Sequence, residues 1–181
     1  MKGEFFHKRK QEFAGFGLEE HYLGPKINWD SIYAKHGLRE KGKELNLKQW
    51  VELFKKAYPL DPQSPKKKWS KDIFDFTAKE LGLDIEEPEG LSFYNATGSG
   101  LDFRGIDCFF VFKNPKTKKE AFVTIDLTKE EKKDEWKADF VLHEFPDYRP
   151  ESGQYDQYIE EMEKRTEEIA EKLKNKTEIV H

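Results

Sequence analysis

Two apolar segments separated by a short turn constrain this chain more than any other feature. Residues 106–113 read Ile-Asp-Cys-Phe-Phe-Val-Phe-Lys, and residues 120–128 read Glu-Ala-Phe-Val-Thr-Ile-Asp-Leu-Thr. Aromatic and β-branched side chains dominate both segments, as is typical of strands. The intervening residues 114–119, Asn-Pro-Lys-Thr-Lys-Lys, have turn chemistry. The sequence therefore predicts a β-hairpin in the middle third of the chain.

The register of this hairpin brings two acidic residues together. If Lys113 and Glu120 close the turn, Asp107 falls directly opposite Asp126 on the same face, with Cβ atoms ~5 Å apart. A loop one residue longer or shorter would leave the pair diagonal but still close. A separate alternative is that one of the two aspartates lies at a strand end and faces solvent. Both aspartates lie inside apolar segments, so their repulsion favours a shared proton or a bound cation. A hard divalent ion with oxygen ligands is the interpretation we prefer.

Helices are predicted around the hairpin from apolar periodicity and from Gly and Pro positions. The expected fold class is α+β, with a central mixed sheet flanked by helices. Strands are expected at 91–96 and 138–143, although 136–142 also fits a helix. Helices are expected at 28–36, 47–57, 67–81 and 153–176. A Pro-rich stretch at 59–65 suggests three parts: an N-terminal helical module (1–58), an α/β core (66–150) and a C-terminal helix (153–176).

Composition excludes several classes of protein. The chain of 181 residues is 36% hydrophobic, with 15 Phe and 4 Trp, which favours a folded core over disorder. No apolar run approaches the ~20 residues of a membrane span. The charged N-terminus lacks the apolar run of a secretory signal. With a single cysteine, Cys108, an internal disulfide is excluded, so a cytoplasmic protein is expected. Scattered histidines argue against zinc, and no phosphate-binding Gly-rich motif is present.

Charge is distributed unevenly along the chain. Residues 1–71 hold 16 Lys and Arg against 9 Asp and Glu, whereas the remainder holds 16 against 27. The acidic part contains the aspartate pair, and the basic part is suited to phosphate contacts. Chance unevenness in a chain rich in Lys and Glu explains the same numbers equally well.

The hairpin resembles the core of the PD-(D/E)XK nuclease superfamily, also called the restriction-endonuclease-like core. The resemblance rests on Gly105-Ile106-Asp107, the hairpin, and the segment 125–129, Ile-Asp-Leu-Thr-Lys. It covers about residues 66–145. The family core is an α-β-β-β-α-β unit in which a helix supplies a glutamate, the second strand an aspartate, and the third strand an acidic residue followed two positions later by lysine.

The resemblance implies a set of site residues. Glu80 on the helix, Asp107 and Asp126 would be catalytic and would hold Mg²⁺ or Mn²⁺, with the carbonyl of Leu127 as a further ligand. This chain departs from the family at Thr128, which stands where the lysine should be. Lys129 is the nearest replacement, although on a regular strand it points to the other face. The lesser candidates for the lysine role are Lys132 and Lys133.

The function implied is hydrolysis of phosphodiester bonds in DNA or RNA by a divalent-metal-dependent nuclease. The metal would lower the pKa of a bound water, and Lys129 would position that water or stabilise the transition state. The alternative is a non-catalytic module that keeps the nuclease-like fold and binds nucleic acid or a protein partner. Thr128 favours this alternative.

The C-terminal helix carries a narrow apolar stripe with heptad spacing, composed of Tyr155, Ile159, Met162, Thr166, Ile169 and Leu173. Such a stripe either packs on the protein's own core or pairs with a second copy to form a homodimer. Because it covers only about three heptads and contains a threonine, we expect packing within the chain.

Overall fold

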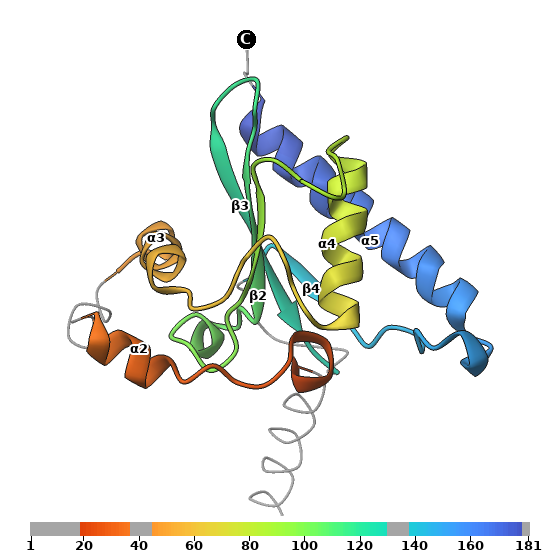
Figure 1. Ribbon diagram of the computed structural model, residues 1–181, viewed down its shortest axis with the longest axis horizontal. Coiled ribbons are helices and arrows are strands. Elements are labelled where there is room, and N and C mark those ends of the chain that lie inside the picture. Colours follow the sequence, from red (N-terminus) through yellow and green to blue (C-terminus); the bar gives the residue numbers. More distant parts are fainter. Residues whose placement is uncertain (1–18, 37–44, 130–137, 179–181) are drawn as a thin grey trace, which may run out of the picture.

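The computed structural model describes residues 19–36, 45–129 and 138–178. It is an α+β protein in which helices cover both faces of a four-stranded mixed sheet (Figure 1). The helices are α2 (Trp29–Lys35), α3 (Leu47–Ala57), α4 (Lys68–Glu80) and α5 (Tyr155–Thr177), with short 3-10 turns η2 (Asp102–Arg104) and η3 (Pro150–Ser152). The strands are β1 (Leu91–Asn95), β2 (Cys108–Lys113), β3 (Glu120–Leu127) and β4 (Phe140–Leu142). The expected fold class is therefore confirmed.

The strands lie in the order β1-β2-β3-β4. β1 and β3 both run antiparallel to β2, and β4 runs parallel to β3. A parallel pair needs a long connection, and 12 residues, 128–139, separate β3 from β4 in the sequence. The short segment at 140–142 is thus a strand, as expected, because its residues complete the sheet beside β3.

The helices α2 and α3 begin where the sequence supplies a side-chain cap. The side chain of Asn28 accepts the N–H of Ser31 (3.1 Å) at the start of α2. Asn46 and Gln49 form a reciprocal capping box at the start of α3 (3.0 Å in each direction). The helix α3 ends one residue before Tyr58, which precedes Pro59, as the restriction on residues before proline predicts.

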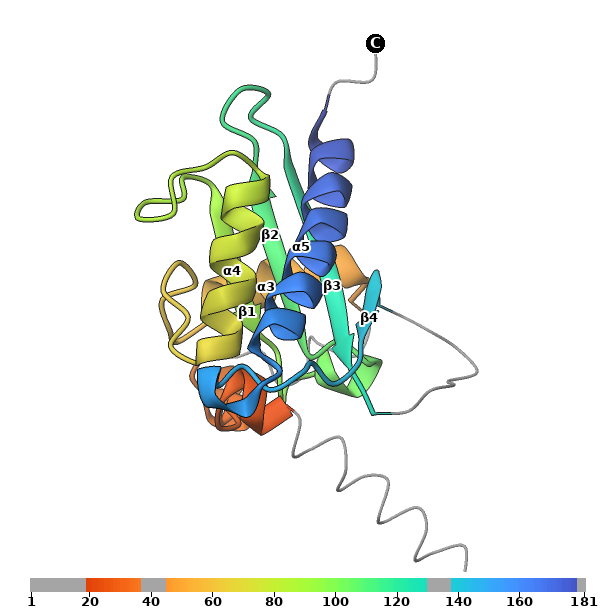
Figure 2. The same ribbon diagram turned by 90° about the vertical axis from the view of Figure 1, so that its right-hand side faces the viewer.

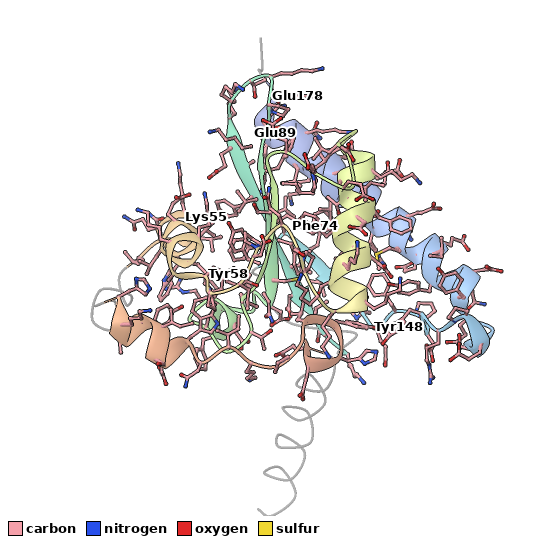
Figure 3. The ribbon with its side chains drawn as sticks, in the orientation of Figure 1. Lys55, Tyr58, Phe74, Glu89, Tyr148 and Glu178 are labelled. Atoms are coloured by element: carbon pink, nitrogen blue, oxygen red, sulfur yellow. The ribbon has the colours of Figure 1, made fainter. Side chains whose placement is uncertain are left out.

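Alternation along the strands divides the core into two clusters, one on each face of the sheet. On the first face, Phe110 of β2 packs near Phe74 of α4, and the buried residues of α5 complete this cluster. On the second face, Phe109 of β2 packs against Phe54 of α3, with Trp29 of α2 beyond it. Figure 3 shows Phe74 between α4 and the sheet. The N-terminal helices therefore share a core with the sheet.

The apolar stripe of α5 packs within the chain. Met162, Ile169 and Leu173 are fully buried in the first cluster, and α5 runs beside α4 across the sheet (Figure 2). The end of α5 also bonds the hairpin tip, where Thr117 donates its hydroxyl to the carbonyl of Thr177 (2.9 Å). Among the described helices, none combines the length and apolar character that a membrane span requires.

Candidate metal centre

The hairpin has the register that the sequence predicts. Its ladder runs from the Lys113–Glu120 pair to the Cys108–Ile125 pair. Beyond this ladder, the N–H of Asp107 donates to the carbonyl of Ile125 (2.9 Å), the residue that already pairs with Cys108, so the strands depart from the regular register at Asp107. Cys108 and Ile125 point into the cluster beneath α4 and α5. By alternation, Asp126 of β3 faces the other side of the sheet, at the end remote from the hairpin tip, and Asp107 directly precedes β2 at the same end.

Both carboxylates are withdrawn from water. Asp107 is 4% exposed and Asp126 is 5% exposed. The Oδ2 atom of Asp107 accepts the backbone N–H of Leu127 (2.6 Å), a charge-assisted bond that fixes its rotamer. This arrangement orients the remaining oxygen of Asp107 independently of any ligand.

Two further acids complete the group, Glu19 and Asp102. One carboxylate oxygen from each lies within 4.8 Å of the others and of an oxygen of Asp107. Glu19 comes from the helical residues 19–23, which lie at the end of the sheet opposite the hairpin tip (Figure 1). Asp102 begins η2, and its Oδ2 accepts the N–H of Gly98 (2.5 Å). We call Glu19, Asp102, Asp107 and Asp126 the acid cluster.

The turn that precedes β2 positions half of this cluster. Leu101 is fully buried and anchors the turn, and the N–H of Gly105 donates to the carbonyl of Asp102 (2.8 Å). Gly105 has a φ of 73°, in the left-handed region that favours glycine. A side-chain carbon at this position would lie 3.8 Å from Oδ2 of Asp126. The glycine therefore lets the chain turn over Asp126 before it enters β2.

Burial changes the electrostatics of Asp107. Its pKa is raised to about 8, mainly because burial penalises the charged form. The Leu127 N–H lowers this pKa, whereas the charges of Glu19, Asp126 and Asp102 raise it further. The three charged groups that act on the pKa of Asp107 are thus all acidic. A hard divalent cation would stabilise the ionised form, and the oxygen donors present are those that Mg²⁺ and Mn²⁺ prefer.

The structure does not bring Glu80 into this cluster, although the sequence predicts it as a site residue. It ends α4, which covers the opposite face of the sheet from the aspartates. Its carbonyl accepts the Nζ of Lys174 (2.5 Å) in the last turn of α5, beside the hairpin tip. The apolar stripe of α4 is real, but α4 runs away from the acid cluster, so its last residue lies at the far end of the strands.

The two residues after β3, Thr128 and Lys129, point to alternate sides of the sheet, as strand alternation requires. Thr128 is buried and follows Asp126 on the same face. Lys129 is exposed, and its Nζ lies 3.6 Å from Oε2 of Glu144. The strand therefore does not turn Lys129 toward the aspartates, contrary to the role expected for it. The lesser candidates Lys132 and Lys133 lie outside the described residues.

Leu127 contributes to the site through its backbone. Its side chain is buried in the first core cluster, while its N–H holds Asp107. The proposed role of its carbonyl as a metal ligand stays a prediction.

Sequence reasoning missed Glu19 and Asp102. Asp102 had a usable signal, because it lies five residues before Asp107 in a turn bounded by Gly98, Gly100 and Gly105. Glu19 had none, since its approach depends on how a distant segment crosses the end of the sheet. Comparison of the chain with protein families, with curated proteins and with solved structures finds no match.

Proposed function

We propose that this protein is a divalent-metal-dependent nuclease that hydrolyses phosphodiester bonds of DNA or RNA. The observation that carries the proposal is the acid cluster, in which an oxygen of buried Asp107 lies within 4.8 Å of oxygens of Glu19 and Asp102, and the charge of buried Asp126 acts on Asp107 as well. Buried like charges are costly without a cation. An arrangement that concentrates them at one end of a sheet is typical of a functional site.

The order of elements supports membership in the PD-(D/E)XK superfamily as part of this proposal. The helix α4 is followed by the antiparallel strands β1, β2 and β3 and then by β4, which lies parallel to β3. The family unit has the same order, with a helix between its third and fourth strands. The corresponding connection here lies mostly in residues 130–137, outside the described part of the chain. A cytoplasmic location belongs to the same proposal.

The residues of the cluster divide the chemical work. Asp107, Asp126, Glu19 and Asp102 would hold Mg²⁺ or Mn²⁺, which when bound supplies a water of lowered pKa and neutralises phosphate charge. Asp107 must release its proton for this, and the N–H of Leu127 stabilises the resulting carboxylate. In this scheme Glu19 takes the part that the family resemblance gave to Glu80.

An exposed aromatic side chain beside the cluster supports nucleic acid as the substrate. Phe103 is 89% exposed and follows Asp102 directly in η2. The next residue, Arg104, lies over the ring of Trp50, 5.9 Å from its centroid. Aromatic rings of this kind stack on bases of any sequence, with ~1–3 kcal/mol per base.

The proposal is tested by incubating the purified full chain with end-labelled DNA and RNA in Mg²⁺, in Mn²⁺ and in EDTA. Cleavage is expected with either metal and is expected to disappear in EDTA. Asp126→Asn should abolish it, because one ligand charge is lost. Asp156→Asn is the matched control, since Asp156 is an exposed residue of α5, which packs on the other face of the sheet from Asp126. Cleavage that persists in EDTA would refute the metal mechanism.

The second candidate function is a nucleic-acid-binding module without catalysis. It is favoured by Thr128, which is buried where the family has its lysine, and by Lys129, which lies beside Glu144 instead. This module would bind the same labelled strands in Mg²⁺ but leave them intact. A gel that shows binding without products therefore separates the two functions.

A further inference from the structure

A lysine-rimmed cavity lies beside the acid cluster. It has a volume of about 490 Å³ and is formed by residues 23–27, residues 58–67 and the edge strand β1. Tyr58, Phe93 and Asn95 line its interior. Three exposed lysines belong to its wall, Lys26, Lys66 and Lys67. Sites for small organic ligands typically have volumes of ~300–1,000 Å³.

The charge of this cavity is suited to an anion. Among the described residues that line it, Asp61 is the one carboxylate, against the three lysines. Lys66 donates to the neutral hydroxyl of Ser64 (2.7 Å), so this contact leaves its charge uncompensated. The helix α4 begins beside the wall, and its N-cap Lys67 provides no side-chain cap. The first N–H groups of α4 therefore add positive potential to that of the lysines.

The interior is apolar and contains a fixed aromatic ring. The hydroxyl of Tyr58 accepts the backbone N–H of Asn95 (3.1 Å), which holds the ring against β1. Tyr58 also packs on Tyr94 in a T-shaped contact with centroids 5.0 Å apart. Figure 3 shows Tyr58 between α3 and the sheet. A ligand that matches both wall and interior has a flat apolar part joined to a phosphate.

The cavity and the acid cluster meet at Gly98. A side-chain carbon at Gly98 would lie 3.6 Å from Cδ of Lys26, so the Lys26 side chain passes over this turn. On the same turn, the N–H of Gly98 donates to Asp102 of the cluster. A strand whose phosphate lies at the cluster would therefore pass Lys26 and reach the cavity with an adjacent nucleotide.

We propose that this cavity binds one unpaired nucleotide of the nucleic-acid substrate, with its base inside and its phosphates on Lys26, Lys66 and Lys67. The inference rests on the proposed function for its substrate class. Since a base within a closed duplex is stacked and paired, it must leave the helix before it enters the cavity. The structure therefore assigns the protein a preference for single-stranded, frayed or flapped substrates over closed duplex.

The test measures binding in EDTA, so that it does not depend on metal or cleavage. Fluorescence anisotropy of a labelled single strand and of the same strand in a blunt duplex would be followed over a range of salt concentrations. The triple variant Lys26→Gln, Lys66→Gln, Lys67→Gln is expected to bind the single strand at least about tenfold more weakly. Its log–log salt slope should be shallower by about 2, since each lost phosphate contact on a single strand removes ~0.7.

The matched control is Lys48→Gln, Lys56→Gln, Lys116→Gln, which removes the same charge from exposed positions on α3 and the hairpin tip. Its affinity should stay within about twofold of the unmodified chain. Adenosine monophosphate should compete with the strand more strongly than inorganic phosphate, and the triple variant should lose this difference. Equal losses in both triple variants, or equal competition by the two anions, would overturn the inference. A protein that shows the expected binding but no cleavage would refute only the proposed catalysis.

Discussion

Two buried aspartates on opposite faces of the sheet have contrasting surroundings. Asp72 of α4 accepts two bonds from Nζ of Lys68 (2.6 and 2.5 Å) and one from the hydroxyl of Tyr158 (2.7 Å). Asp107 accepts one backbone N–H, and the charged groups that perturb it are Glu19, Asp126 and Asp102. One carboxylate has a cation beside it, whereas the other is surrounded by further carboxylates.

The two aspartates illustrate two reasons for burying a charge: Asp72 stabilises the fold, whereas Asp107 belongs to the proposed functional site. The Lys68–Asp72 pair is an i,i+4 pair on one helix, and Tyr158 joins it across the α4–α5 interface, so Asp72 strengthens the fold. For Asp107 the neighbouring carboxylates bring no comparable gain, because they raise the free energy of its ionised state. Residues that conflict with stability in this way are expected at functional sites.

The largest expected effect is on cleavage. Asp107→Asn should reduce metal-dependent cleavage by at least ~10²-fold, because bound metal contributes several kcal/mol of transition-state stabilisation. Asp72→Asn should leave cleavage within about threefold at a temperature where the variant remains folded. Rates would be measured under single-turnover conditions, with circular dichroism as the control for folding. Equal losses in both variants would show that the acid cluster has no special role.

The next effect is on stability as a function of pH without metal. The raised pKa of Asp107, about 8, means that the folded state keeps a proton which the unfolded state loses near pH 4. The free energy of unfolding should therefore be highest below pH 4 and fall as pH rises toward 8, by up to ~1.4 kcal/mol per pH unit, and then level off. In Asp107→Asn this fall should be absent. Urea denaturation in EDTA at pH 5, 6, 7 and 8 measures it.

In the same experiment, Asp72→Asn should change the free energy of unfolding in the opposite direction to Asp107→Asn. It loses charge-assisted bonds to Lys68 and Tyr158 and should lower the free energy of unfolding by ~1–3 kcal/mol at neutral pH. Asp107→Asn should instead raise it at pH 7, because the cost of retaining a proton is removed. A flat pH profile for the unmodified chain, or a destabilised Asp107→Asn at pH 7, would contradict this account.

The sequence predicted the parts of this molecule that depend on local pattern. The strand alternation and the turn at 114–119 were sufficient for the hairpin register from the Lys113–Glu120 pair to the Cys108–Ile125 pair. They did not reveal that Asp107 bonds the carbonyl of Ile125, one position out of that register. Capping at Asn46 was sufficient for the start of α3. In each case neighbours in the sequence determine the outcome, so no knowledge of the tertiary fold was needed.

The sequence could not predict how distant segments meet at the site. The stripe of α4 showed which side of Glu80 is buried, but the direction in which α4 crosses the sheet placed Glu80 at the hairpin tip. The arrival of Glu19 depends on the first described helical residues reaching the opposite end. Both outcomes follow from tertiary packing, which the apolar periodicity of one helix cannot predict.

A smaller effect separates the two glutamates. Glu19→Gln is expected to reduce cleavage about tenfold, because one oxygen of Glu19 lies within 4.8 Å of Asp102 and Asp107. Glu80→Gln should change it by less than about twofold, since Glu80 lies at the other end of the strands. Mn²⁺ titration of the two variants gives a second measurement, in which only Glu19→Gln should weaken metal binding. A strong loss of cleavage in Glu80→Gln would show that Glu80 has the catalytic role that the family resemblance implied.

The smallest effect is expected at Lys129. Its side chain is 41% exposed and lies 3.6 Å from Glu144, which is 62% exposed, so the ion pair is screened by water. Lys129→Gln should therefore change the free energy of unfolding by less than ~0.5 kcal/mol. If catalysis needs a lysine at this position, the strand would have to bulge in the complex with substrate to bring Lys129 to the aspartates' face.

These alternatives differ in how cleavage responds to two substitutions. Lys129→Gln and Glu144→Gln should each change the cleavage rate by less than about threefold if the lysine remains on the outer face. Should substrate draw Lys129 inward, Lys129→Gln would instead lose at least ~10² in rate, and Glu144→Gln, which frees the lysine, would gain. Because both side chains are exposed, neither substitution disturbs the core. The two cleavage rates therefore show on which face of β3 Lys129 lies during catalysis.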